Sequence, residues 1–106
     1  MAGRVIWHRL AEEDLTKAYL YIGAGSPDAA ERLLDAVEQT VEFLLENPRA
    51  GRIQEFRSPR GQGVRSWVVK GFQSYLLFYR PDGDDLDVVR FLHGARNLPR
   101  LLGEET

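Results

Sequence analysis

The sequence of 106 residues contains no cysteine, and its one methionine is the first residue. Without a thiol, the chain can form no disulfide, offer no thiolate to a metal and use no cysteine nucleophile. Histidine is scarce as well, because His8 and His93 are the two in the chain and stand far apart in the sequence. The two histidines form no His-rich spacing that would support a metal site. We therefore expect no metal site and no cofactor.

Long hydrophobic runs are also missing. The densest apolar stretch, around residues 75–79, is far shorter than the roughly 20 residues that cross a bilayer. The N-terminal region turns acidic from Glu12 onward and lacks the apolar core of a secretory signal. We expect a cytoplasmic protein without membrane contact.

Lysine is nearly absent, since Lys17 and Lys70 stand against twelve arginines. The formal net charge of −2 argues against a strongly basic nucleic-acid binder, so no direct, specific nucleic-acid binding is expected. The charge is unevenly spread: residues 1–50 hold five basic and nine acidic side chains, whereas residues 49–70 hold six basic and one acidic. The bias toward arginine favours planar, bidentate recognition of carboxylate or phosphate.

Two segments show the apolar periodicity of amphipathic helices. The first covers residues 11–24, and its acidic run ending at Asp14 fits the positive end of a helix dipole. The second covers residues 27–46, with Ser26 as its N-cap. Its predicted buried stripe consists of Ala30, Leu33, Leu34, Val37, Val41, Leu44 and Leu45. The short connection predicts an antiparallel helix hairpin.

Strands are predicted at residues 4–8, 64–70, 74–80 and 86–93, and a loop at residues 49–63. Alternation along the last strand predicts two faces, with Leu86, Val88, Arg90 and Leu92 on one and Asp87, Val89, Phe91 and His93 on the other. The order β-α-α-β-β-β predicts an α+β fold in one domain over residues 1–106. In it, the helix hairpin covers one face of a small, mainly antiparallel sheet, and the N-terminal strand adds an edge.

Two large apolar side chains, Leu20 and Phe43, fall well outside the predicted helix stripes, and a third, Tyr21, lies at the edge of one. Two interpretations stay open for them. They form a surface for a partner, or they fill gaps against the sheet and loops.

The candidate polar site residues are arginines of the sheet and its ends, together with one histidine. Arg65, Arg80, Arg90 and Arg96 converge to hold RNA phosphates or the acidic residues of a partner, or they pair with carboxylates of neighbouring strands. His93 is placed to act as a general acid or base, or it is a strand-end imidazole bonded to the backbone.

Several segments also carry a family resemblance. They are AEEDLTKAYLYI at residues 11–22, YLLFYR at residues 75–80 and VVRFLHGAR at residues 88–96. In this order they resemble the ParE toxins of the RelE/ParE superfamily, and the resemblance spans roughly residues 4–102. It implies the RelE/ParE-like fold and the toxin of a type II toxin–antitoxin module.

The resemblance implies a non-enzymatic toxin that inhibits DNA gyrase by binding and is neutralised by a ParD-like antitoxin in a hetero-oligomer. It implies that the antitoxin binds Leu20, Tyr21, Phe43, Arg65 and Arg80.

The target surface implied for gyrase consists of Arg90, His93 and Arg96. The alternative is a RelE-like, ribosome-dependent mRNA endoribonuclease, with Arg65, Arg90 and His93 as its catalytic residues.

Overall fold

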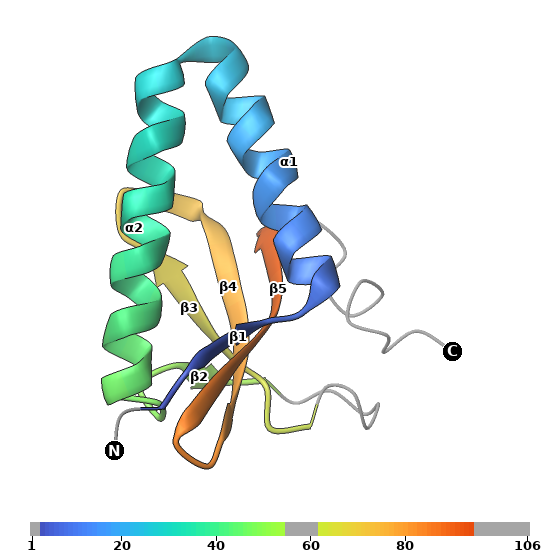
Figure 1. Cartoon of the computed structure of the whole chain (residues 1–106), viewed down its shortest axis with the longest axis vertical. Helices are drawn as coiled ribbons and strands as arrows, with labels where there is room; N and C mark the ends of the chain where they lie inside the picture. Colours follow the sequence, from blue (N-terminus) through green and yellow to red (C-terminus); the bar gives the residue numbers. More distant parts are fainter. Residues whose placement is uncertain (1–2, 55–61, 95–106) are drawn as a thin grey trace.

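The computed structural model describes residues 3–54 and 62–94. The elements in chain order are β1 (Val5–Trp7), α1 (Arg9–Gly25), α2 (Pro27–Glu46), β2 (Arg52–Ile53), β3 (Arg65–Val69), β4 (Phe72–Asp82) and β5 (Asp85–His93). The two helices lie together on one side of the sheet and diverge from their connection, as Figure 1 shows. The predicted α+β class and the helix hairpin are thus confirmed.

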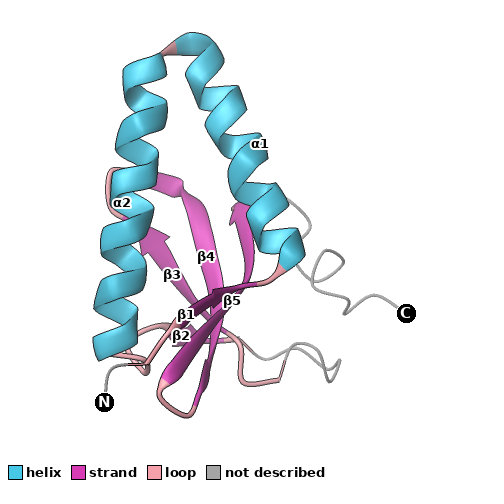
Figure 2. Cartoon of the chain, viewed as in Figure 1, coloured by secondary structure: helices cyan, strands magenta, loops and turns pink. Residues whose placement is uncertain are grey.

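The five strands form one sheet in the order β1-β5-β4-β3-β2 (Figure 2). β1 pairs with β5 in parallel, and every other pairing is antiparallel. The predicted mainly antiparallel sheet with an N-terminal edge strand is therefore confirmed. The β4–β5 turn places Gly83 at a φ of +59°, a conformation that favours glycine.

β2 was not predicted, because the sequence between α2 and β3 was interpreted as a loop. Arg52 pairs with Ser66 and Ile53 pairs with Arg65. A strand of two residues is too short to show any alternation of apolar and polar side chains, so the pattern carried no signal for it. The part of the expected loop at residues 55–61 lies outside the described residues.

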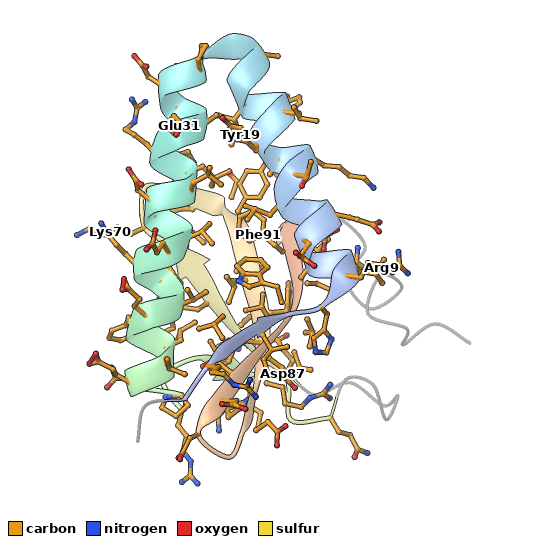
Figure 3. The ribbon with its side chains drawn as sticks, viewed as in Figure 1. Arg9, Tyr19, Glu31, Lys70, Asp87 and Phe91 are labelled. Carbon is orange, nitrogen blue, oxygen red and sulfur yellow. The ribbon has the colours of Figure 1, made fainter. Side chains whose placement is uncertain are left out.

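The hairpin connection matches the sequence prediction. Ser26 has an extended backbone, and its side-chain oxygen accepts a hydrogen bond from the Ala29 N–H at 3.1 Å. Across the hairpin, the Tyr19 hydroxyl donates to a Glu31 carboxylate oxygen at 2.6 Å, and Figure 3 shows the two side chains between the helices. This bond raises the pKa of Tyr19. The bond connects α1 to α2 on their exposed side.

The main core lies between the hairpin and the sheet. The predicted stripe of α2 supplies buried side chains such as Leu33 and Leu44, and β4 and β5 supply Tyr79 and Phe91. A second, smaller cluster consists of Val64, which precedes β3, with Phe78 of β4 and Leu92 of β5.

The predicted alternation along β5 is wrong at one point. Val88 pairs with Tyr79, but Arg90 pairs with the adjacent Phe78, so Val89 is an extra residue in the strand. This bulge places Phe91 in the same core cluster as Leu86 and Val88, whereas strict alternation assigned it to the opposite face. One inserted residue shifts the side-chain period by one step.

Candidate functional site

Arg65 on β3 binds the backbone of the segment that follows α2. Its guanidinium donates to the carbonyl oxygens of Gly51 at 2.9 Å and of Arg49 at 3.3 Å. These bonds direct the Arg65 side chain to the backbone of residues 49–51 and hold in place the segment that leads into β2. Arg65 therefore has a structural part in the fold, whatever it contributes to a partner.

Tyr79 on β4 secures the same segment from the core. Its ring is fully buried, and its hydroxyl donates to the Pro48 carbonyl and accepts from the Gly51 N–H, both at 2.8 Å. Burial raises the pKa of Tyr79, while the Gly51 bond and the charge of Arg65 partly offset that shift. A Cβ on Gly51 would clash with the Tyr79 hydroxyl oxygen, so this contact requires glycine.

Arg90 on β5 forms a buried ion pair with Asp14 of α1. Its Nε and a terminal nitrogen contact the two carboxylate oxygens at 2.7 and 2.9 Å, and the two side chains are 14% and 8% exposed. The hydrogen bond to Asp14 is the main cause that raises the pKa of Arg90. Asp14 also accepts from the Phe91 N–H at 3.0 Å. This pair therefore fastens α1 to β5 beside the bulge.

The role of Asp14 corrects the sequence interpretation. α1 begins at Arg9, two residues before the predicted start, so Asp14 lies beyond the first turn of the helix. The helix dipole acts within the first turn and does not account for Asp14. Its partner is 76 residues away in the sequence, so no local pattern indicated the pair.

His93 lies exposed at the end of β5, in a cluster of aromatic rings. Its ring meets that of Tyr75 edge-on at a centroid distance of 5.3 Å, and Tyr75 stacks on Phe91 at 5.2 Å. Burial raises the pKa of Tyr75, and a charge on Tyr21 adds to the shift. The phenol of Tyr75 therefore stays protonated at neutral pH, which makes it a poor general base.

The proposed ribonuclease residues do not share one site in this structure. Arg65 pairs with Tyr79, and Tyr79 pairs with Val88, so Arg65 lies two strands, or about 10 Å, from β5. His93 lies five residues beyond Val88, which adds roughly 15 Å along the strand. The two side chains are thus too far apart to hold one phosphate.

The remaining sheet arginines are also separated. Arg80 donates to the Gln62 carbonyl at 3.1 Å and, as the neighbour of Tyr79 along β4, points to the face of the sheet away from Arg65. Arg96 lies outside the described residues. The structure therefore does not bring Arg65, Arg80 and Arg90 together into one cluster.

The three apolar side chains that were predicted to lie outside the helix stripes or at the edge of one are exposed. Leu20 is 67% exposed, Tyr21 79% and Phe43 43%. They do not form one patch: Gly23 lies level with Ala30, and Phe43 is 13 residues further along α2, about 20 Å at the helical rise. Leu20 and Tyr21 therefore lie near the hairpin end, and Phe43 lies elsewhere.

Phe43 borders a groove between α2 and β3 with a volume of about 960 Å³. Its ring packs on Trp67 of β3 at a centroid distance of 5.3 Å. The charged residues in the lining are Arg52 and Lys70, both basic, and Figure 3 shows Lys70 at the outer side of α2. We call this feature the α2–β3 groove.

Sequence reasoning did not select the groove residues Arg52, Trp67, Val68 and Lys70 as a site. The available signal was the excess of basic residues between positions 49 and 70, because Arg52 and Lys70 belong to that excess. That signal did not separate arginines that face the backbone, such as Arg65, from cations that face the groove.

The described residues contain no group of three or more histidine and acidic side chains placed to hold a metal ion. Within the same part of the chain, neither helix has the length and apolar composition of a membrane span.

Comparison with known proteins gives consistent matches. Residues 5–98 match the family described as the ParE toxin of the type II toxin–antitoxin system parDE. The chain is 32% identical to Toxin ParE3 of Caulobacter vibrioides over 105 residues, which cover 98% of this chain and 99% of the relative.

A solved structure supports the fold. A chain of the chromosomal ParDE toxin–antitoxin system from P. aeruginosa superposes with a TM-score of 0.66 at 24% identity, covering 88% of this chain and 96% of the other. With the family match across nearly the whole sequence, these findings show that the chain belongs to the ParE toxins of type II toxin–antitoxin systems.

Proposed function

We propose that this toxin inhibits DNA gyrase by binding it and that a ParD-like antitoxin neutralises it. The observation that carries the proposal is the match of residues 5–98 to the ParE toxin family. The resemblance of this chain to ParE toxins implies gyrase as the target. Because gyrase acts on chromosomal DNA, the proposed place of action is the cytoplasm.

The geometry supports binding over catalysis. Among the described residues, Arg90 is paired with Asp14, Arg65 is bonded to two backbone carbonyls, and His93 lies far from Arg65. A ribonuclease needs its acid, base and phosphate clamp within reach of one phosphate. The described side chains offer no such set, so we favour a non-enzymatic toxin.

The target surface that we propose includes His93 and the adjacent end of β5. His93 is exposed there beside the half-buried ring of Tyr75, which stacks on the buried Phe91. Aromatic residues are enriched at the centres of protein interfaces. Arg90 is nearly buried, so we expect it to support this surface by holding β5 on α1.

A gyrase assay tests the proposal. Purified toxin is titrated into DNA supercoiling reactions, and the expected result is loss of supercoiling that is restored by its antitoxin. His93→Ala should weaken inhibition, while Lys17→Ala, on the exposed side of α1, serves as the matched control.

The same preparation is tested for mRNA cleavage on translating ribosomes. Full supercoiling at a large excess of folded toxin would contradict the proposal. Cleaved transcripts together with unaffected gyrase would support the endoribonuclease alternative instead.

A further inference from the structure

One edge of the sheet is open along most of β3. β2 pairs with β3 at Arg65 and Ser66, and in the described part of the chain no strand lies beside Trp67, Val68 or Val69 on that side. The Gln54 N–H donates to the Val64 carbonyl at 2.8 Å, so the backbone of Val64 faces β2. Since backbone groups alternate along a strand, the N–H and C=O of Val68 face the same way. They point outward beyond the end of β2.

This open edge lies in the α2–β3 groove. The groove is lined by β3 residues from both faces of the sheet, because Trp67 packs toward the helices while Ser66 and Val68 lie on the other face. A groove that contains both faces of a strand must contain its edge. On the far side, the α2 wall presents Phe43 and polar side chains.

The groove combines apolar walls with one sign of charge. Phe43, Trp67, Val68 and Leu76 contribute apolar surface, and Val68 is 43% exposed. Arg52 and Lys70 are the charged groups of the lining, and no described carboxylate is part of it. An exposed strand edge flanked by cations fits an extended peptide that carries acidic side chains.

We propose that the α2–β3 groove binds an extended, acidic peptide segment that adds a strand to the open edge of β3. This inference rests on the proposed function in one respect, because we assign the segment to the antitoxin. The outward N–H and C=O of Val68 pair with the peptide backbone. Apolar side chains of the peptide pack on Trp67 and Phe43, and its carboxylates meet Arg52 and Lys70.

The geometry also limits the segment. The free edge of β3 from Trp67 to Val69 spans three residues, or roughly 10 Å at the rise of a strand. Side chains of an added strand point alternately toward α2 and away from it, so one apolar set faces Trp67. We therefore expect a core of three to four residues in which apolar and acidic side chains alternate.

The test uses the purified full chain and a fluorescein-labelled ten-residue peptide in which glutamate alternates with valine. Binding is followed by fluorescence anisotropy. Wild-type protein should bind this peptide, and added salt should weaken the binding. The same peptide with lysine in place of glutamate should not bind.

The backbone contact is tested by Val68→Pro, which removes the outward N–H but no bond between β3 and β4. Loss of one or two backbone hydrogen bonds should weaken binding about tenfold or more. Val68→Ala keeps the N–H and is the matched control. Circular dichroism shows whether each variant folds. If Val68→Pro does not fold, a peptide N-methylated at every second amide tests the same bond against wild-type protein.

The charge contact is tested by Arg52→Glu combined with Lys70→Glu, which should abolish binding. Wild-type affinity in Val68→Pro, or for both N-methylated registers, would overturn the strand-addition proposal. Tight binding of a labelled oligothymidylate that is lost on charge reversal but kept in Val68→Pro would identify a nucleic-acid site and also overturn it. No gyrase is present in this assay, so its outcome is independent of whether the chain inhibits gyrase.

Discussion

Two buried polar side chains connect segments of this toxin that are distant in the sequence. Tyr79 bonds the Pro48 and Gly51 backbone after α2, and Asp14 binds Arg90 and the Phe91 N–H across the contact between α1 and β5. Buried polar groups cost free energy unless they are bonded, so removing either partner leaves another group unsatisfied. These positions should therefore dominate the response to point mutations outside the apolar core.

Tyr79→Phe should lower the free energy of unfolding by about 1–3 kcal/mol, because the Gly51 N–H loses its partner in a buried site. Burial keeps the pKa of Tyr79 above 10.0 in the folded state. The folded state therefore holds this proton more tightly, and the stability it provides is lost as pH rises above about 10.

Urea unfolding at pH 7 and at pH 10 to 11 measures both effects for Tyr79→Phe. The variant should lose the part of the alkaline destabilisation that Tyr79 causes. Tyr19→Phe is the control at pH 7, since its bond to Glu31 is exposed. Equal free energies of unfolding for Tyr79→Phe and wild type at pH 7 would show that the bonds of the Tyr79 hydroxyl to Pro48 and Gly51 do not stabilise the fold.

Asp14→Ala should be more severe, with a loss of about 3–5 kcal/mol, because it removes the carboxylate that compensates the buried charge of Arg90. Combining Asp14→Leu with Arg90→Met should recover part of this loss, while the Phe91 N–H stays unbonded. Glu13→Ala is the control, because its contact with Arg9 is exposed and is worth about 1 kcal/mol or less. Thermal unfolding of all three proteins gives the comparison, and a mild effect of Asp14→Ala would contradict the structural role.

At the scale of elements, the helices can be predicted from the local sequence pattern, whereas parts of the sheet cannot. α2 has the predicted bounds, since its apolar stripe and its cap are written in adjacent residues. β2 and the bulge at Val89 depend on a partner strand, and neither leaves a periodic signal. The same bulge brings Phe91 into the core and places its N–H against Asp14.

Ser26→Ala should destabilise the fold by about 1 kcal/mol, because the Ala29 N–H loses its cap. Ser26→Asp should stay close to wild type, since a carboxylate caps the helix equally well. Denaturant midpoints of the two variants measure the difference. A larger loss for the aspartate variant would indicate that the turn itself, not the cap, controls the stability of the hairpin.

At the scale of the whole molecule, the surface divides into regions of different character. An acidic α2 stands on one side of the α2–β3 groove, which is basic, and the exposed Leu20 and Tyr21 lie near the hairpin end. An exposed apolar pair contributes little to folding and is available to a partner. An antitoxin that wraps the toxin would contact both the groove and the hairpin end, and its acidic residues would meet the basic groove.

Leu20→Ser combined with Tyr21→Ser should change the free energy of unfolding by about 0.5 kcal/mol or less, because both side chains are largely exposed. The same change should weaken the antitoxin complex about tenfold or more, a loss of about 1.4 kcal/mol. Titration calorimetry with the antitoxin measures it, and Lys17→Ser on the same helix is the control. An unchanged dissociation constant would exclude this pair from the interface.

The sequence by itself determined the α+β class, the bounds of α2, the position of Leu20 outside the helix stripes, and the resemblance to ParE toxins. Each of these depends on neighbouring residues or on order along the chain. The partners of Arg65 and Arg90 and the open edge of β3 were decided only by the tertiary structure. The acceptor of an arginine depends on which groups lie near it in space. A strand edge is open only when no distant segment of the chain pairs with it.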